Sequence, residues 1–319
     1  MTDPRPLRVG LIGAGTIARL AQLPSLAADP SVTIAGVVTG SAAETDEVLR
    51  RWPIERGYGG AEELLEHAAV DAIFVLTPKQ LHTQYVQLGI QAGVGVYCEK
   101  PLASTLEDAE RLASAAQTTS APVMVGLNRR FAPVYQEAHA LMKEPPLFAV
   151  GQKHRVGSEY RATIENGIHM VDLLRWFCGD AIEVTATSAG DQWAEDGTAA
   201  MIRFDSGATA LFLAARVAGE WDERLELFGA NTTVRVVAPD QMSVVTGGRS
   251  TTMTMRAEAA GWVDITMSAG FAPAVAHFLD CVRTGRRPLT DAAEGLASLR
   301  LALDIVAAAG LPTSDRDDA

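Results

Sequence analysis

The chain has 319 residues, of which 48% are hydrophobic and 21% are charged, and its formal net charge is −12. This length allows two domains, and this composition is typical of a soluble globular protein with filled cores. The acidic balance argues against nucleic acid or an anionic membrane as a partner.

The three cysteines, Cys98, Cys178 and Cys281, are far apart and form no C-x-x-C pair. We therefore expect no metal site and no disulfide framework, but buried thiols in a reducing compartment. The longest apolar runs are shorter than the roughly 18–20 residues that a membrane helix requires, and residues 1–6 are polar. The sequence thus predicts a cytoplasmic protein.

A glycine-rich turn stands near the start of the chain. Residues 9–13 read as a buried parallel strand, and Gly13, Gly15 and Ala18 follow as G-x-G-x-x-A before a helical pattern. Strand, glycine turn and helix in this order favour a dinucleotide site, whose phosphates meet the helix N-terminus. We expect the coenzyme to contact Gly13, Gly15, Thr16, Ile17 and Ala18. The alternative is a purely structural turn.

The second strand, residues 32–38, ends in Thr39, Gly40 and Ser41. An acidic residue at this place would hold the ribose 2′-hydroxyl and favour NAD, and none ends the strand. Two hydroxyls and a glycine could receive a 2′-phosphate, so the sequence favours NADP over NAD. The alternative is that these residues are only a turn and a helix cap.

Two further apolar strands, residues 70–76 and 94–98, end in chemically informative residues. Thr77 and Pro78 follow the first, where ligands bind in such sheets, and we expect them to line the nicotinamide side. His82 begins the next helix, and it either contacts the ligand or makes a hydrogen bond at the helix start.

Glu99, Lys100 and Pro101 come directly after the strand at residues 94–98. A lysine is rarely placed at the buried end of a core strand, and a partly desolvated lysine can exchange a proton near neutral pH. We therefore expect Lys100 to act in proton transfer, with Glu99 beside the coenzyme. The alternative is a surface ion pair between the two.

The motifs GxGxxA, TPxxLH and EKP, at these intervals, resemble those of the Gfo/Idh/MocA family, and the resemblance runs from Leu7 to about Gly310. It implies an α/β fold: an N-terminal Rossmann domain with a doubly wound parallel sheet, and a C-terminal α+β domain with a large, mainly antiparallel open sheet. It also implies NAD(P)-dependent oxidation or reduction of a sugar, cyclitol or related polyol. The free sheet face of the family predicts a homodimer or homotetramer.

Residues 126–133 resemble the segment in which the family crosses into its second domain. Asn128 and Arg130 are expected there to hold substrate hydroxyls, because the donors of arginine form a fixed fork. The alternative is that Arg129 and Arg130 only start the following helix and stay solvated. We place the domains at residues 1–126 and 127–312, followed by an acidic tail at 313–319.

The pattern of residues 165–180 predicts an otherwise apolar helix. Three ionisable groups lie on one face of it: Glu165, His169 and Asp172. They resemble the family pattern D-x-G-x-H-x-x-D, in which the first acid and the histidine are catalytic. Glu165 stands in place of that Asp, and its extra methylene shifts the carboxylate. Asp172 is expected to orient His169 or its helix beside the substrate. The alternative for His169 is a core histidine held by a carboxylate.

These expectations together predict hydride transfer between a nicotinamide and a carbinol or ketone carbon. Lys100 touches the substrate oxygen, and His169 shares the proton, so that the pKa values of the two groups are coupled. Another class of function stays open, in which the chain binds coenzyme and sugar as a sensor without turnover. The identity of the substrate does not follow from the sequence.

Overall fold

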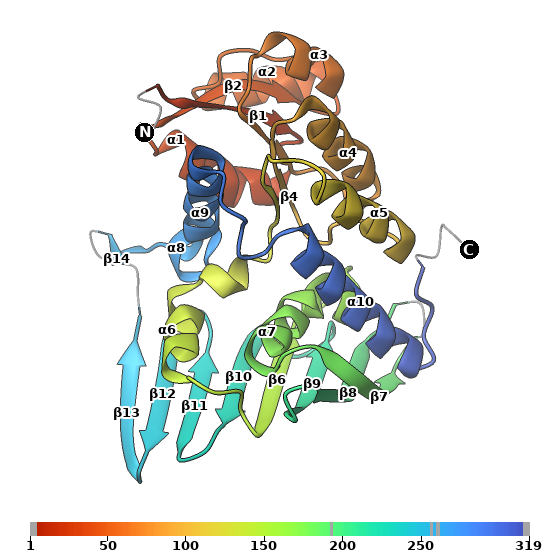
Figure 1. Cartoon of the computed structure of the whole chain (residues 1–319), viewed down its shortest axis with the longest axis vertical. Helices are drawn as coiled ribbons and strands as arrows, with labels where there is room; N and C mark the ends of the chain where they lie inside the picture. Colours follow the sequence, from red (N-terminus) through yellow and green to blue (C-terminus); the bar gives the residue numbers. More distant parts are fainter. Residues whose placement is uncertain (1–4, 192–193, 256–257, 260–261, 315–319) are drawn as a thin grey trace. The chain divides into compact units, whose positions relative to one another are not determined.

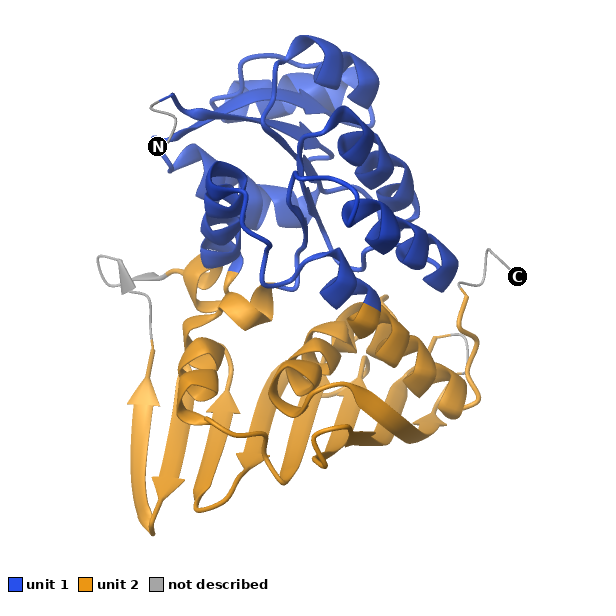
Figure 2. Cartoon of the chain, in the orientation of Figure 1, with its two compact units in different colours: residues 1–127, 271–296 blue, residues 128–270, 297–319 orange. Residues whose placement is uncertain are grey.

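The computed structural model describes residues 5–191, 194–255, 258–259 and 262–314. Two compact units divide the chain, one of residues 1–127 and 271–296, the other of residues 128–270 and 297–319 (Figure 2). The sequence placed 271–296 in the second domain, whereas the structure returns this segment to the first unit. Of the predicted acidic tail, 315–319 lie outside the described residues.

The first unit is built on a five-stranded parallel sheet (Figure 1). Its strands are nearly continuous apolar runs, as expected when helices cover both faces of a parallel sheet. In spatial order they are β2 (Val32–Val38), β1 (Leu7–Ile12), β3 (Ala72–Val75), β4 (Gly95–Cys98) and β5 (Val123–Val125).

The helices of this unit pack on both faces of the sheet. Where the chain leaves a strand, polar caps start the helices: the side chains of Ser41 and Thr105 accept hydrogen bonds from the backbone N–H groups of Glu44 and Asp108. The helices are α1 (Leu23–Ala27), α2 (Ala42–Arg51), α3 (Ala61–His67), α4 (His82–Ala92), α5 (Leu106–Ala116) and α9 (Phe271–Thr284).

Helix α9 explains why residues 271–296 belong to the first unit. The ring of Phe278 meets the rings of Phe74 on β3 and Tyr97 on β4 edge-on, at centroid distances of 5.3 and 5.7 Å. Beyond the helix, the Thr290 hydroxyl donates to the carbonyl of Val125 at 2.7 Å, beside the edge strand β5. These apolar and polar contacts fasten the returning segment to the sheet.

The strand order changes direction between β1 and β3. From β1 the chain moves outward to the edge strand β2, and it then returns to β3 on the other side of β1. A crevice forms at such a switch point, outside the carboxyl ends of the strands, and this is where open α/β sheets bind ligands. The glycine turn after β1 and the loop after β3 lie at this edge.

The second unit is built on an eight-stranded sheet in which only β6 and β9 pair in parallel. In spatial order the strands are β13 (Arg249–Thr254), β12 (Gln241–Thr246), β11 (Thr232–Val237), β10 (Asp222–Phe228), β6 (Phe148–His154), β9 (Thr209–Ala215), β8 (Gly197–Phe204) and β7 (Ala181–Ala189). A separate short pair is β14 (Glu258–Ala259) with β15 (Trp262–Val263).

Helices cover one face of the large sheet and bury its inward side chains. Along β8 and β9 buried and exposed residues alternate, as in a sheet with one covered face. The core joins inward residues such as Ile202 and Phe212 to Leu174 of α7 and Ile305 of α10. The helices of this part are α6 (Pro133–Leu141), α7 (Ile168–Cys178), α8 (Ile265–Ser268) and α10 (Ala292–Ala308). The predicted fold class is confirmed.

Candidate active site

The glycine turn after β1 packs directly against the loop after β3. Gly13 has a φ of +95°, and a Cβ atom there would lie 2.6 Å from the carbonyl oxygen of Leu76 and 2.9 Å from the nitrogen of Thr77. Only glycine accepts both this left-handed backbone and this close approach. The two loops that border the switch point can therefore pack closely only because residue 13 is a glycine.

The other side of the turn is open. Apart from its neighbours along the chain, no atom of the described residues comes within 4 Å of the place that a Gly15 Cβ would take, and Gly15, Thr16 and Ile17 are exposed. Helical backbone runs from Thr16 to Ala27, with a π-helical stretch at Ala18–Gln22, and Ala18 is buried. The first N–H groups of a helix lack partners within it and attract phosphates. This turn therefore fits a dinucleotide pyrophosphate.

The loop after β3 adds a polar atom to this edge. The Thr77 hydroxyl is buried and makes no hydrogen bond with any part of the chain that the structure describes, and Pro78 beside it is exposed. A buried hydroxyl normally has a partner, so its orphaned state is consistent with a ligand at this place.

His82, at the start of α4, is almost fully buried and contacts two loops. Its Nε2 lies 3.0 Å from the carbonyl oxygen of Thr77, and its Nδ1 lies 2.6 Å from that of Pro101. Burial lowers the pKa of His82. Of the two interpretations left open by the sequence, the structure favours the backbone hydrogen bond, because both ring nitrogens face carbonyls of the protein.

The Glu99–Lys100–Pro101 segment leaves the carboxyl end of β4. Gln22, which is fully buried, donates from Nε2 to the Glu99 carboxylate at 2.5 Å, and the backbone N–H of Lys100 donates to the same carboxylate at 3.3 Å. Burial raises the pKa of Glu99. Lys100 is half-buried, and a cis peptide bond joins it to Pro101. Glu99 therefore holds the backbone from which the lysine side chain extends.

The turn after β2 is bonded internally. The Thr39 hydroxyl lies 2.9 Å from the carbonyl oxygen of Ser41, and Ser41 caps α2 as the alternative interpretation expected. The backbone N–H of Gly40 donates to the Glu44 carboxylate at 3.3 Å. The inference of NADP rested on a strand tip without an acid, and this premise is wrong because α2 brings a carboxylate back to the tip.

In the second unit, the segment before His169 is not the continuous α-helix that the sequence predicted. Residues Ala162–Gly167 form a π-helix, and α7 begins at Ile168. The Glu165 carboxylate accepts the backbone N–H of Arg161 at 2.8 Å, so it caps the turn in which it lies. The α-helical spacing assumed for Glu165 therefore holds only from Ile168 onward, because Glu165 lies in the π-helical stretch.

His169 lies in the first turn of α7 and is 9% exposed. Gly167 just before it has no room for a side chain, because a Cβ would lie 2.8 Å from the carbonyl oxygen of Ala162 and 2.7 Å from the ring of Phe212. The π-helix and Gly167 therefore fix the position of the backbone that carries the His169 side chain.

Asp172 and Arg130 form a buried ion pair. Nε and Nη2 of Arg130 donate to the two carboxylate oxygens at 2.9 and 2.7 Å, and the Ser298 hydroxyl donates to the carboxylate at 2.8 Å. Neither side chain is more than 3% exposed. Their bidentate contact fastens α7 to the Asn128–Phe131 turn, and it engages the guanidinium that the sequence expected to hold substrate hydroxyls.

Asn128 is also buried, and its side-chain amide donates to the carbonyl oxygen of Ala269 at 2.6 Å. Its carbonyl oxygen is buried without a partner among the described residues. One end of the amide is therefore used by the protein, and only the other end is left for the predicted substrate contact.

Sequence reasoning missed a second group of buried charges in this unit. Glu223 on β10 accepts two bonds from Arg129, at 2.7 and 3.1 Å, and it also contacts Lys153 on β6 and the Tyr135 hydroxyl. Burial lowers the pKa of Lys153 to about 7. The alternation of the strand could have predicted this burial, because Lys153 lies on the same inward face of β6 as Ala149 and Gly151.

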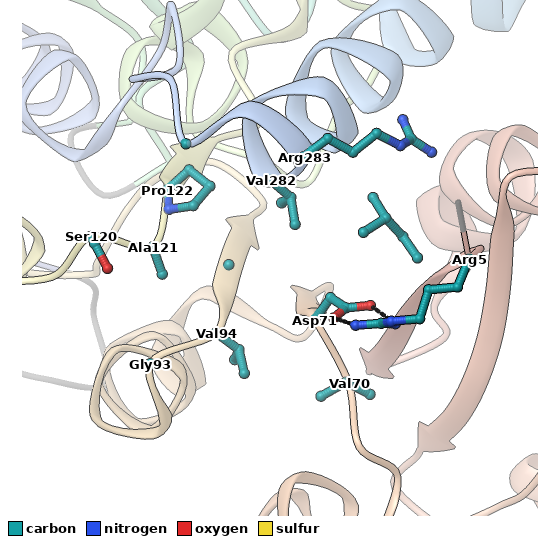
Figure 3. Close-up of a pocket in the computed structure, with 13 residues that line it drawn as sticks. Arg5, Val70, Asp71, Gly93, Val94, Ser120, Ala121, Pro122, Val282 and Arg283 are labelled. Atoms are coloured by element: carbon teal, nitrogen blue, oxygen red, sulfur yellow. Dashed lines mark hydrogen bonds and ion pairs between the residues drawn. The ribbon is translucent and has the colours of Figure 1, made fainter. Parts of the chain in front are cut away.

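A separate hollow lies at the opposite edge of the parallel sheet. Figure 3 shows Arg5 and Asp71, which line it, side by side, and hydrogen bonds of 2.9 and 2.7 Å join them. Leu7, Gly95 and Pro122, which also line it, stand at or just before the starts of their strands. This hollow is therefore at the amino edge of the sheet, away from the glycine turn.

Comparison with known sequences identifies the family. Residues 7–127 match the model of an oxidoreductase family with an NAD-binding Rossmann fold, and residues 149–235 match that of the GFO/IDH/MocA C-terminal domain. The chain belongs to the Gfo/Idh/MocA family. The predicted membership is confirmed, and so is the prediction of an oxidoreductase with a coenzyme-binding Rossmann domain.

Relatives with assigned activities cover most of the chain. It is 27% identical to a D-apiose dehydrogenase of Paraburkholderia graminis over 78% of this chain and 73% of that protein. It is 26% identical to an inositol 2-dehydrogenase of Rhizobium meliloti over 93% of this chain and 94% of the relative.

Solved structures share the fold. A UDP-N-acetylglucosamine 3-dehydrogenase of Acidithiobacillus ferrooxidans has a TM-score of 0.85 at 22% identity, over 95% of this chain and 97% of that one. An oxidoreductase of Agrobacterium radiobacter, solved with NAD⁺, L-tartaric acid and magnesium, has a TM-score of 0.86 at 21% identity, over 95% and 96%. Among the described residues, no helix is long and apolar enough to cross a membrane.

Proposed function

We propose that this protein transfers a hydride between a nicotinamide coenzyme and a carbinol or ketone carbon of a sugar, a cyclitol or a related polyol. Membership of an NAD-binding oxidoreductase family supports the redox chemistry. Relatives named for apiose and inositol support the substrate class. The observation that carries the proposal is the open glycine turn beside the orphaned Thr77 hydroxyl.

The carboxyl edge of the parallel sheet would hold the coenzyme. Gly15, Thr16 and Ile17 are exposed there and would face the phosphates, and Thr77 and Pro78 follow β3 at the same edge of the sheet. When bound, the nicotinamide supplies or accepts the hydride. The protein's own contribution is to orient the ring and to place a proton donor near the substrate oxygen.

Lys100 and His169 handle the proton in this proposal. The backbone of Lys100 is bonded to the Glu99 carboxylate, which Gln22 holds in turn. An amine supported in this way can protonate a forming alkoxide, or accept the proton when the reaction runs toward the ketone. The imidazole of His169 shares that proton. Glu165 shapes the turn before His169, since its carboxylate caps the π-helix.

We also propose that copies of the chain associate through the open face of the eight-stranded sheet. Met201, Leu211 and Leu213 are exposed on neighbouring strands, and Met201 lies directly opposite Leu211. Such an apolar face on an antiparallel sheet is typical of an interface between subunits. A homodimer or homotetramer should appear in light scattering after gel filtration, and Leu211→Glu should shift it to the monomer. A wild-type monomer would refute this part of the proposal.

Two measurements test the proposed function. Fluorescence titration with NADH and NADPH reports coenzyme binding, and absorbance at 340 nm across a panel of aldoses, ketoses and inositols reports turnover. We expect binding together with turnover of at least one polyol. Tight binding of coenzyme and sugar without turnover would support the sensor instead, and absence of coenzyme binding would refute both functions.

A further inference from the structure

The adenosine end of the proposed coenzyme site contains a cluster of charged side chains that belongs to no sequence motif described above. Arg19, on the helix that starts at the glycine turn, donates from Nε to the carbonyl oxygen of Ala14 at 2.7 Å. Its Nη1 donates to Glu47 at 2.6 Å, and its Nη2 lies 3.5 Å from Glu44. One guanidinium thus ties the glycine turn to the first turns of α2.

Glu44 carries this cluster to the tip of β2. One of its carboxylate oxygens faces Arg19, and the other accepts the backbone N–H of Gly40 at 3.3 Å. The side chains of Arg19 and Glu44 are 25% and 33% exposed, so both can meet a ligand. The hydroxyls of the turn are used differently: that of Thr39 bonds to Ser41 and Thr45, and that of Ser41 caps α2.

In a dinucleotide fold, the tip of the second strand lies beside the adenosine ribose. A carboxylate at this place accepts the ribose 2′-hydroxyl of NAD, and an arginine nearby accommodates the 2′-phosphate of NADP. Here the two groups stand together, and the arginine is already paired with two carboxylates. A 2′-phosphate would have to displace Glu44 before it could bind Arg19, and it would meet the repulsion of both acids.

We propose that Glu44 is the ribose acceptor of this protein, and that its pairing with Arg19 selects NAD over NADP. The acid comes from the helix, four residues beyond Gly40, rather than from the end of the strand. Arg19 could bind a 2′-phosphate, but its guanidinium is already paired with Glu44 and Glu47. This inference rests on the proposed function, because it assumes that the glycine turn binds a nicotinamide coenzyme.

The test is the ratio of the NADPH to the NADH dissociation constant, measured by fluorescence titration. We expect wild-type protein to bind NADH at least tenfold more tightly than NADPH. Glu44→Gln should lower this ratio at least tenfold, by weakening NADH and strengthening NADPH. The double variant Arg19→Gln with Glu44→Gln should not gain NADPH affinity, because it lacks the guanidinium that would bind the 2′-phosphate.

Glu63→Gln is the matched control. The Glu63 carboxylate makes the same kind of contact in the first turn of α3, where it accepts the backbone N–H of Gly59 at 2.8 Å. Its loss should leave the ratio within about threefold of the wild-type value. Equal or tighter binding of NADPH by the wild type would overturn the inference, and so would an unchanged ratio in Glu44→Gln. Binding of neither coenzyme would instead refute the proposed function itself.

Discussion

Nδ1 of His82 lies 2.6 Å from the carbonyl oxygen of Pro101, so a buried imidazole connects the loop after β3 to the loop that carries Lys100. Its other nitrogen faces the carbonyl oxygen of Thr77 at 3.0 Å. The same ring therefore contacts both loops at the carboxyl edge of the sheet. Although His82 stands in a motif next to the coenzyme site, its geometry is that of a positioning residue.

Replacing His82 by leucine should loosen both loops. Because burial lowers the pKa of His82, the neutral ring donates one N–H, and the carbonyl that accepts it would be left unsatisfied at a cost of about 1–3 kcal/mol. Since a displacement of about 1 Å in a catalytic group can cost roughly 100-fold, we expect kcat to fall about 10- to 100-fold. His67→Leu, at an exposed histidine at the end of α3, is the control. A kcat equal to that of the wild type would contradict this role.

Asp172→Ala should destabilise the protein strongly. The substitution leaves the buried guanidinium of Arg130 without its carboxylate, and breaking a buried pair in this way typically costs about 3–5 kcal/mol. The double replacement Arg130→Met with Asp172→Leu should recover most of the loss, because no charge stays buried. Guanidinium titration measures both effects.

The same variants test whether Asp172 contacts substrate. If its role is structural, the double variant should keep the wild-type KM once it is folded. A KM raised tenfold or more in the refolded double variant would show that the Arg130–Asp172 pair contacts substrate.

Lys153 predicts a dependence of stability on pH. Burial lowers its pKa to about 7, whereas a lysine in the unfolded chain keeps its proton up to about pH 10.4. Between these values the unfolded state binds more protons, so the free energy of unfolding should rise with pH, by at most about 1.4 kcal/mol per unit. Below pH 7 Lys153 is protonated in both the folded and the unfolded state, and the folded state bears the full cost of burying its charge.

Lys153→Met removes this dependence, while Glu223 keeps Arg129 as its partner. Relative to the wild type, the variant should be most stable near pH 6, and its advantage should shrink between pH 7 and 9. Chemical denaturation at pH 6, 7, 8 and 9 measures the difference. A difference that stays constant over this range would show that Lys153 does not titrate there.

Much of the fold could be predicted from the sequence because its elements carry strong local signals. The strand at 32–38 has the expected bounds, and a helix begins at His82 as expected, since apolar runs and turn residues delimit them. The positive φ of Gly13 likewise follows from the G-x-G spacing. The membership of the family rests on motifs of the same local kind.

What could not be predicted depends on contacts between distant residues. The pairing of Arg130 with Asp172 joins positions 42 residues apart, and the return of α9 to the parallel sheet depends on Phe278 meeting Phe74. The π-helix before His169 has no strong sequence signal. In the sequence Glu44 lies beyond the strand end, and only the folded helix α2 brings its carboxylate to Gly40.

Lys100→Met tests the central claim, that this amine handles the proton in a nicotinamide-dependent reaction. The substrate oxidised or reduced by the wild type at 340 nm is given to the variant, and the NADH dissociation constant of both proteins is measured. We predict that kcat falls about 10²- to 10⁴-fold, the usual contribution of a general acid or base, while coenzyme affinity stays within about threefold. Turnover equal to that of the wild type, with the same coenzyme affinity, would contradict the account.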